Sequence, residues 1–383
     1  MRDSYLIFGQ PLIEEPEIEE VVKCMRAAWL GTGPKVAQFE QLVAEYKGVE
    51  HAVAVNSCTA GLHLCCVALG LGAGDEVLVP AMTFCATINA VIHAGATPVL
   101  VDVEADSFNM DPTDVRRKIT PRTRAIMPVH FAGRSCKMDE ISMIAREHGL
   151  RMIEDCAHAI ETEFHGRKAG TWGDCGVLSF YATKNIVTGE GGMVFTNDAN
   201  IAARIKRLAL HGLSQDAWNR FSDDGYKHYE VVEIGFKYNM MDLQAAIGLH
   251  QIARVDHYWQ RRLKIWNQYN SAFAGLPVQT PAPFERQTRH ALHLYTLLVG
   301  DGDESVTRDR LIVELHRRKI GTGVHYRAIP RHPVYRNRFG WTPADFPIAD
   351  QIGQRTISLP LSAKLTEADV DDVIEAVTET VRN

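Results

Sequence analysis

Short apolar runs alternate with longer amphipathic segments between residues 50 and 211 of this chain. Apolar runs that end at turn residues predict buried strands, and apolar positions three and four residues apart predict helices that pack on them. Strands are expected at 51–55, 76–80, 97–101, 124–129, 151–155, 176–180 and 192–196, and helices at 60–70, 139–148 and 201–211. This alternation favours an α/β domain whose largely parallel sheet is covered by helices on both faces.

The pattern changes after Met241. Apolar residues at helical spacing continue over 241–273 and predict one long helix that leads out of the first domain. A proline-rich connector is followed by a smaller set of elements, with strands at 292–299, 322–326 and 356–359 and helices at 307–319 and 366–381. We therefore expect a large domain over 1–250 and a smaller C-terminal α/β domain over 251–383, which this chain length can support.

Two chemically reactive side chains follow predicted strands. Asp155 ends the strand at 151–155, and Lys184 lies just beyond the strand at 176–180. Because ligands collect at the carboxyl ends of parallel strands, we expect both side chains at one site. A lysine can hold pyridoxal phosphate (PLP) as a Schiff base, and a carboxylate beside the pyridine nitrogen keeps that nitrogen protonated. The pair predicts a PLP enzyme with Lys184 and Asp155 as its catalytic residues.

A third segment supplies a place for the phosphate of PLP. Residues 56–61 form a polar turn before a predicted helix, so the amides of Cys58, Thr59 and Ala60 would meet an anion at a helix N-terminus. Ser179 would add a hydroxyl donor. Each feature alone has an ordinary explanation, since a lone lysine is usually a surface charge and an aspartate at a strand end often caps a helix. Their combination favours the cofactor site.

Eight motifs in order along the chain connect these residues to a known family. They are TGPKVAQFE (32–40), NSCTAGLH (56–63), PAMTFCAT (80–87), PVHFAG (128–133), IEDCAHA (153–159), SFYATKN (179–185), GEGGMV (189–194) and GFKYNMMDLQAAIG (235–248). From about residue 8 to its end, the chain resembles the DegT/DnrJ/StrS family of PLP-dependent nucleotide-sugar aminotransferases. The resemblance implies the fold type I aminotransferase architecture, with a mostly parallel seven-stranded sheet in the large domain. It also implies a homodimer whose active sites lie at the subunit interface.

Within the family, three segments are similar to the ArnB branch, which forms UDP-4-amino-4-deoxy-L-arabinose. These segments are HGLSQDAWNR (211–220), GFKYN (235–239) and IGTGVHYRA (320–328). The similarity implies transfer of an amino group from L-glutamate to a nucleotide-linked 4-keto sugar, in lipopolysaccharide or other polysaccharide biosynthesis. Lys184 would be both the anchor of the cofactor and the acid/base that moves the proton. Relatives with histidine at this position are dehydratases, so the lysine indicates transamination.

The resemblance implies further cofactor contacts. Phe84 would stack on the PLP ring, and His158 would reach its side. A residue of the GFKYN segment would enter the phosphate site of the partner subunit. Many relatives have asparagine and arginine where this chain has Lys237 and Asn239, so which of the two reaches the partner stays open. Core packing, a core histidine and a surface lysine are ordinary alternatives for Phe84, His158 and Lys237.

The substrate pocket is expected to draw on the ArnB-like segments and on two turns. Its candidate residues are Thr32, Gly33, Tyr181, Arg220, His325, Tyr326 and Arg327. The planar fork of an arginine matches a carboxylate or a diphosphate, although each arginine can equally form a salt bridge at the rim. These residues do not fix the regiochemistry. C3 amination of a nucleotide-linked 3-keto hexose, a different PLP reaction and a non-catalytic PLP-binding regulator are the alternatives.

Composition argues against several other classes of protein. A net charge of −6 and a pI near 6.2 give no electrostatic footprint for nucleic acid. The eight cysteines lack CxxC spacing, so we expect buried, reduced thiols in the cytoplasm and no metal site. The first residues show no signal-peptide pattern, and no uncharged apolar stretch reaches about 18 residues, so no membrane segment is expected.

Overall fold

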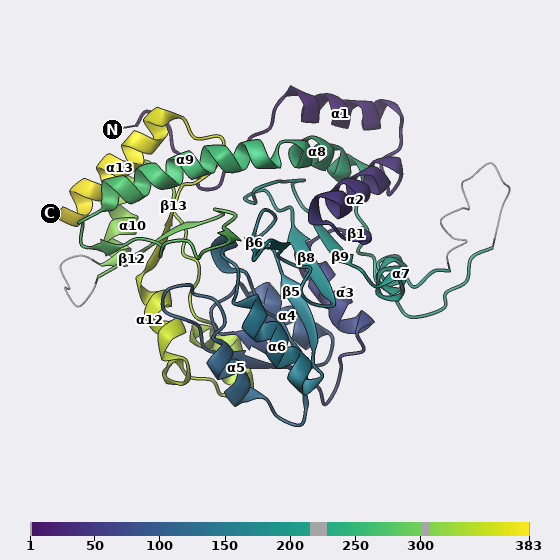
Figure 1. Cartoon of the computed structure of the whole chain (residues 1–383). Helices are drawn as coiled ribbons and strands as arrows, with labels where there is room; N and C mark the ends of the chain where they lie inside the picture. Colours follow the sequence, from purple (N-terminus) through teal and green to yellow (C-terminus); the bar gives the residue numbers. More distant parts are fainter. Residues whose placement is uncertain (1, 215–227, 301–306, 383) are drawn as a thin grey trace.

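A computed structural model of the chain describes residues 2–214, 228–300 and 307–382 (Figure 1). Its central feature is the expected seven-stranded sheet. In spatial order the strands are β1 (His51–Val55), β9 (Gly192–Thr196), β8 (Cys175–Ser179), β5 (Arg151–Asp155), β4 (Thr123–Ile126), β2 (Glu76–Pro80) and β3 (Thr97–Val101). β9 runs antiparallel to β1 and β8, and the other neighbouring pairs are parallel, so the predicted fold class is confirmed.

Helices cover both faces of this sheet because successive residues of a strand point to opposite faces. Val177 of β8 packs under one group of helices, whereas Leu178 packs under the other. The first group is α3 (Cys58–Ala68), α4 (Cys85–His93) and α7 (Ala199–Leu208). The opposite face carries α2 (Pro34–Lys47), α5 (Pro112–Lys118), α6 (Met138–His148) and α8 (Asp242–Ala253).

The single helix predicted over 241–273 is wrong, because the chain breaks at Arg254 into α8 and α9 (Val255–Phe273). The Arg254 guanidinium forms ion pairs with Glu14 and Glu17 at the start of α1 (Glu15–Arg26). The break leaves α8 packed against α1 and α2, while α9 continues toward the C-terminal elements. The two helices follow one another along one side of the molecule (Figure 1).

The C-terminal part is built on a small antiparallel sheet. Its strands, in order, are β10 (Val278–Gln279), β12 (Tyr295–Val299) and β13 (Thr356–Leu359). The helices around it are α10 (Arg308–Arg317), α11 (Pro333–Phe339), α12 (Pro347–Arg355) and α13 (Glu367–Arg382). A further short sheet joins β11 (Thr288–Arg289), β6 (Glu163–Phe164) and β7 (Arg167–Lys168).

The strand predicted at 322–326 is wrong. Only Gly323 pairs with the small sheet, where it exchanges backbone hydrogen bonds of 3.1 and 2.8 Å with Ser358. The chain then leaves the sheet, and the hydroxyl of Tyr326 reaches His158 of the large domain. Residues 324–326 therefore do not extend the small sheet, and Tyr326 contacts His158 instead.

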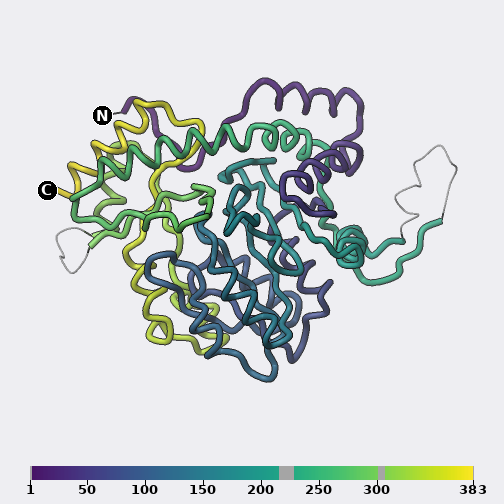
Figure 2. Tube along the Cα trace, viewed as in Figure 1, coloured from purple at the N-terminus to yellow at the C-terminus, as the bar shows by residue number. Residues whose placement is uncertain are grey.

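The N-terminal segment lies on the C-terminal part of the chain. Leu6 exchanges backbone hydrogen bonds of 2.8 Å with Lys319 and Gly321, and the start of the trace lies beside α13 (Figure 2). Further on, Gly9 has φ +66° and lies against Thr183, since a Cβ on Gly9 would be 3.1 Å from the Thr183 Cβ. The segment thus connects residues 319–321, which follow α10, with the loop that follows β8.

The predicted division between the two domains, near residue 250, falls within α8. Buried residues of α8 pack against the large sheet, and buried residues of the directly following α9 pack against the small one. The exact division stays a prediction. Within the described ranges, no helix combines the length and the apolar character needed to cross a lipid bilayer.

Candidate active site

Asp155 is a buried carboxylate at the carboxyl end of β5, with 4% of its surface exposed. Thr87 Oγ1 donates to Oδ2 at 2.9 Å, and the Ala157 N–H donates to Oδ1 at 3.1 Å. Burial raises the pKa of Asp155, although these two hydrogen bonds and nearby Lys184 lower it. Among the described residues, none forms an ion pair with this carboxylate within 4.0 Å. A buried carboxylate of this kind fits the protonated ring nitrogen of PLP, which would supply the missing positive charge.

Lys184 lies in the loop after β8 and faces the same region. Its N–H donates to the Tyr181 carbonyl at 2.8 Å, which fixes the backbone of the loop. Burial lowers the pKa of Lys184 to about 8, although the nearby Cys58 thiol and Asp155 carboxylate favour the charged form. A large fraction of this amine is therefore neutral near pH 8. Only the neutral amine can attack an aldehyde such as that of PLP.

The predicted phosphate cradle is formed by the first turn of α3. Ser57 caps the helix, and its Oγ accepts from the Ala60 N–H at 3.1 Å. Gly192 of β9 lies directly against this turn, because a Cβ on Gly192 would be 2.6 Å from the Cys58 nitrogen. Ser179 pairs with Gly192 across the sheet and so lies next to the cradle. Thr59 is in the same turn, and the half-buried hydroxyls of Ser57 and Thr59 at this helix N-terminus fit a phosphate.

His158 and Tyr326 form one polar aromatic unit. His158 Nδ1 accepts from the Ala132 N–H at 3.2 Å, so Nε2 carries the proton and donates to the Tyr326 hydroxyl at 3.1 Å. Burial lowers the pKa of His158 well below its usual range, which keeps the ring neutral. Phe84, at the start of α4 with 57% of its surface exposed, lies 5.9 Å from the Tyr326 ring. These three predicted residues therefore lie together.

The other candidates from the C-terminal part lie at the edge of this group. His325 Nδ1 is 2.8 Å from the Ser358 hydroxyl, and burial lowers the pKa of His325 to about 4. Arg327 is exposed. Tyr181 is also exposed, at the start of the Lys184 loop.

A second group of candidates gathers elsewhere. Asn239 Nδ2 donates to Thr32 Oγ1 at 2.6 Å, and these residues line a cavity of about 310 Å³ together with Gly33 and Trp29. Lys237 is exposed two residues before Asn239. In the part of the chain that the structure describes, no hydrogen bond links this group to Lys184 or Asp155. The remaining candidate, Arg220, lies outside the described residues.

A family model described as the DegT/DnrJ/EryC1/StrS aminotransferase family matches residues 11–378. The chain belongs to this family. The spore coat polysaccharide biosynthesis protein SpsC of Bacillus subtilis is 47% identical over 382 residues, which cover 100% of this chain and 98% of SpsC. The family is one of PLP-dependent sugar aminotransferases, so this chain is such an enzyme.

Solved structures of family members match the fold closely. The putative sugar aminotransferase Spr1654 from Streptococcus pneumoniae, in its PMP form, has a TM-score of 0.92 and 33% identity, over 98% of this chain and 99% of that one. PseC of Helicobacter pylori, an aminotransferase involved in the biosynthesis of pseudoaminic acid, has a TM-score of 0.91 and 27% identity, over 99% of this chain and 100% of PseC. Both are fold type I enzymes, as predicted.

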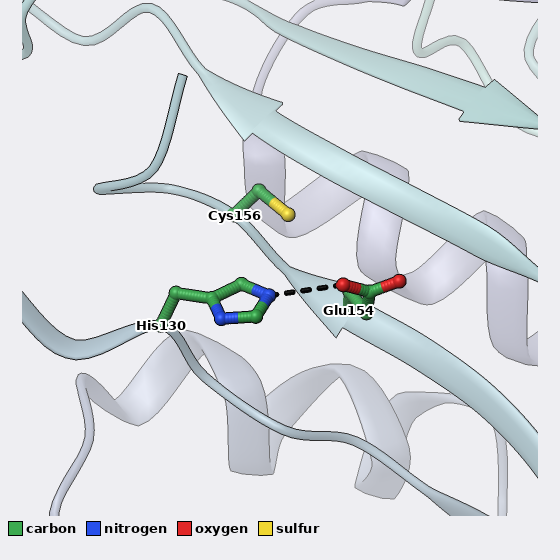
Figure 3. A group of neighbouring side chains, drawn as sticks. All are labelled: His130, Glu154 and Cys156. Carbon is green, nitrogen blue, oxygen red and sulfur yellow. Dashed lines mark hydrogen bonds and ion pairs between the residues drawn. The ribbon is translucent and has the colours of Figure 1, made fainter. Parts of the chain in front are cut away.

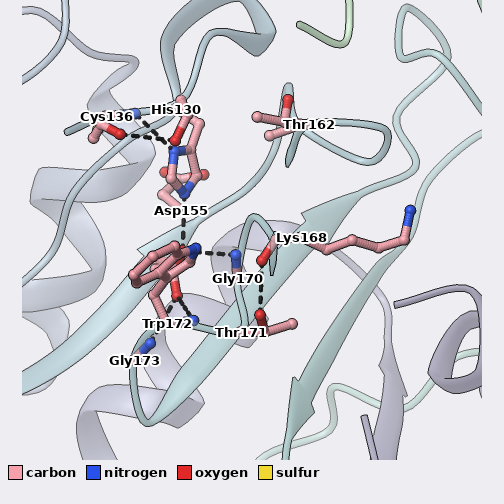
Figure 4. Close-up of polar contacts among 12 residues, drawn as sticks. His130, Cys136, Asp155, Thr162, Lys168, Gly170, Thr171, Trp172 and Gly173 are labelled. Atoms are coloured by element: carbon pink, nitrogen blue, oxygen red, sulfur yellow. Dashed lines mark hydrogen bonds and ion pairs between the residues drawn. The ribbon is translucent and has the colours of Figure 1, made fainter. Parts of the chain in front are cut away.

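A buried cluster of His130, Glu154 and Cys156 has the composition of a metal site (Figure 3). Hydrogen bonds already satisfy its carboxylate: Glu154 accepts from His130 Nε2 at 3.0 Å and from the amides of Gly170, Trp172 and Gly173 at 2.6–2.8 Å. Figure 4 shows the turn formed by residues 168–173 beside the end of β5. The cluster therefore fixes this turn.

Three residues that contact the site were not predicted from the sequence. Thr87, which donates to Asp155, lies within the PAMTFCAT motif, so its position three residues after Phe84 could have identified it. Asn185 directly follows Lys184, and His293 Nδ1 lies 2.9 Å from its side-chain oxygen. Nothing in the spacing of the sequence connects His293 with the lysine loop.

Proposed function

We propose that this family member transfers the amino group of L-glutamate to C4 of a nucleotide-linked 4-keto sugar. The observation that carries the catalytic part is the pair formed by the partly buried Lys184, with a pKa of about 8, and the buried Asp155, which forms no ion pair within 4.0 Å among the described residues. The choice of C4 rests on the ArnB-like segments at 211–220 and 320–328. SpsC and PseC, by their names, serve polysaccharide and pseudoaminic acid biosynthesis.

PLP, when bound, withdraws electrons from the carbon that carries the amino group. Asp155 would hold a positive charge at the ring nitrogen, and the first turn of α3 with Ser179 would hold the phosphate. Lys184 would bind the cofactor and then, as a free neutral amine, would take the proton from the donor's α-carbon and deliver it to the cofactor carbon that the lysine had held. Its lowered pKa suits this exchange near neutral pH.

The sugar would meet a pocket wall that is polar but uncharged. His158 and His325 are neutral because burial lowers the pKa of each. Since His158 donates to the Tyr326 oxygen, the Tyr326 hydroxyl hydrogen is free to donate to a keto or hydroxyl oxygen of the sugar. The exposed Arg327, together with Arg220, would pair with the diphosphate or the donor carboxylate.

We further propose a homodimer in which Lys237, rather than Asn239, reaches the partner's phosphate site. Phe236 and Tyr238 point inward, with the Phe236 ring 4.8 Å from His63 and the Tyr238 hydroxyl 3.5 Å from His63 Nδ1. In an extended segment the intervening residues point the other way. Asn239 is held there by Thr32 of its own chain, whereas Lys237 is exposed.

Subunit mixing tests the shared site. A Lys184→Ala chain is exchanged with a Lys237→Ala chain, and a Lys237→Ala, Asn239→Ala chain serves for comparison. In the mixed dimer one site has both Lys184 and Lys237, so activity should return. If exchange is verified and no activity returns, the segment serves its own chain.

The sugar is tested with the pyridoxamine form of the enzyme. It is incubated with UDP-, GDP- and dTDP-linked 4-keto and 3-keto sugars, and return of the PLP absorbance is recorded. Restoration by 4-keto sugars supports C4 amination, and restoration only by 3-keto hexoses supports the alternative of C3 amination. We place the reaction in the cytoplasm, where nucleotide sugars and reduced thiols coexist.

A further inference from the structure

The two catalytic side chains are linked by a hydrogen bond between the segments that follow them. Asn185, next to Lys184, donates from Nδ2 to Glu161 Oε2 at 2.8 Å and to the Ala291 carbonyl at 2.9 Å. Its Oδ1 is 2.9 Å from His293 Nδ1. Glu161 belongs to the segment that continues from Asp155. The amide of Asn185 therefore joins the lysine loop to the segment of the aspartate.

The orientation of this amide is fixed by its neighbours. Two acceptors, a carboxylate and a carbonyl, face its nitrogen, and a reversed amide would place Oδ1 against both. His293 must then carry its proton on Nδ1 in order to donate to Oδ1. Burial lowers the pKa of His293 well below its usual range, so this ring stays neutral.

Two buried basic side chains hold the segment that contains Glu161. Glu161 has no exposed surface and forms an ion pair with Arg262 of α9, which is itself 2% exposed. Lys47, at the end of α2, is buried with its Nζ 3.4 and 3.3 Å from the carbonyls of Ala159 and Ile160. Residues 159–161 are therefore anchored from two helices and provide a rigid support for Asn185.

Resting on the catalytic roles proposed above for Lys184 and Asp155, we propose that Asn185 and Glu161 are positioning residues that set the spacing between these two side chains. The carbon that lysine binds and the ring nitrogen that aspartate contacts lie at opposite ends of one rigid aromatic ring. The distance between the two side chains must match that ring, and an error of about 1 Å in a reacting geometry can cost about 100-fold in rate. The hydrogen bond from Asn185 to Glu161 is the direct side-chain connection between the two segments.

The first test replaces Asn185 with alanine. We expect turnover to fall by about 100-fold, and covalent capture of added PLP by the apo protein, followed by its visible absorbance, to slow. Noncovalent PLP binding, measured with the Lys184→Ala background by tryptophan fluorescence, should stay unchanged because the phosphate cradle is intact. Asn270→Ala is the matched control, since it removes a similar half-buried amide that accepts from the Tyr295 hydroxyl.

The second test separates positioning from simple stability. Glu161→Leu alone leaves Arg262 buried and unpaired, so its melting temperature should fall. Glu161→Leu with Arg262→Leu removes both charges and should recover the melting temperature, yet Asn185 still lacks its acceptor. Slow PLP capture should therefore persist in the double variant.

Recovery of both the melting temperature and the rate of PLP capture in that variant would overturn the proposal, because Glu161 would then only balance Arg262. Wild-type capture and turnover in Asn185→Ala would overturn it as well. Asn185→Ser, which keeps a polar side chain that is too short to replace the amide at Glu161, tests the same point if the alanine variant does not fold.

Discussion

Glu154 and Asp155 are neighbours in β5, and both are buried carboxylates, yet their surroundings differ. Successive strand residues face opposite sides of the sheet, so Asp155 faces α3 and α4 while Glu154 faces the turn at 168–173. Glu154 accepts four hydrogen bonds from nitrogen donors, whereas Asp155 accepts one from an amide, one from the Thr87 hydroxyl and a long one of 4.0 Å from the Cys58 thiol. A saturated carboxylate holds structure, and one with remaining acceptor capacity can bind a further cation.

The largest expected effect comes from the amine that faces Asp155. Lys184→Ala should lower turnover in both half-reactions by at least about 10²-fold, because general acid/base catalysis alone contributes about 10²–10⁴-fold. The fold and noncovalent PLP binding should persist, as judged by circular dichroism and cofactor content. Lys168→Ala, which removes a lysine paired with Glu163 at 2.9 Å, is the control. Turnover within tenfold of wild type would remove Lys184 from the mechanism.

Asp155→Asn should lower turnover by about 10²-fold with little loss of bound PLP. An amide has no negative charge to balance a positive ring nitrogen. Lowering the pKa of that nitrogen by one unit alone corresponds to about 1.4 kcal/mol. The melting temperature of the apo variant should not fall, because burial already raises the pKa of this carboxyl group. Turnover with glutamate and calorimetry of the apo form check both statements. Wild-type turnover would make Asp155 a structural residue like Glu154.

Covalent uptake of PLP by the apo protein should rise about tenfold between pH 7 and pH 9, with a midpoint near the Lys184 pKa of about 8. The neutral amine reacts, and it forms above that pKa. Since an unfolded lysine keeps its proton up to about 10.5, the apo protein should also gain stability between these two values. Uptake is followed by visible absorbance. A midpoint above 10 would contradict the burial of the amine.

Glu154→Gln should have the smallest effect on catalysis and a clear effect on stability. Its amide nitrogen would face donors, so we expect the free energy of unfolding to fall by about 1.5–3 kcal/mol. Turnover per folded molecule should change little. Glu163→Gln, which alters a half-exposed pair with Lys168, is the control and should cost less than about 1 kcal/mol. Equal losses of turnover in Glu154→Gln and Asp155→Asn would abolish the distinction between them.

Local patterns predicted the large sheet well because its strands are apolar runs bounded by turn residues, and Asp155 and Lys184 stand out at strand ends. The prediction at 322–326 was wrong because only Gly323 of this stretch pairs with the small sheet, at Ser358, and no local pattern shows where such pairing ends. The break at Arg254 depends on glutamates more than 200 positions away. The bond from Asn185 to Glu161 likewise joins residues that no local pattern relates.

The contact made by Gly9 means that proteolysis of the N-terminal segment would affect the lysine loop. Its backbone lies against Thr183, one residue before the proposed catalytic residue Lys184, in a left-handed conformation that favours glycine. The same segment is bound through Leu6 to Lys319 and Gly321, in the chain that follows α10. A protease that cleaved between these residues would leave the seven-stranded sheet intact and yet remove the support behind the lysine loop. Such a cleaved enzyme would keep its fold but have low activity.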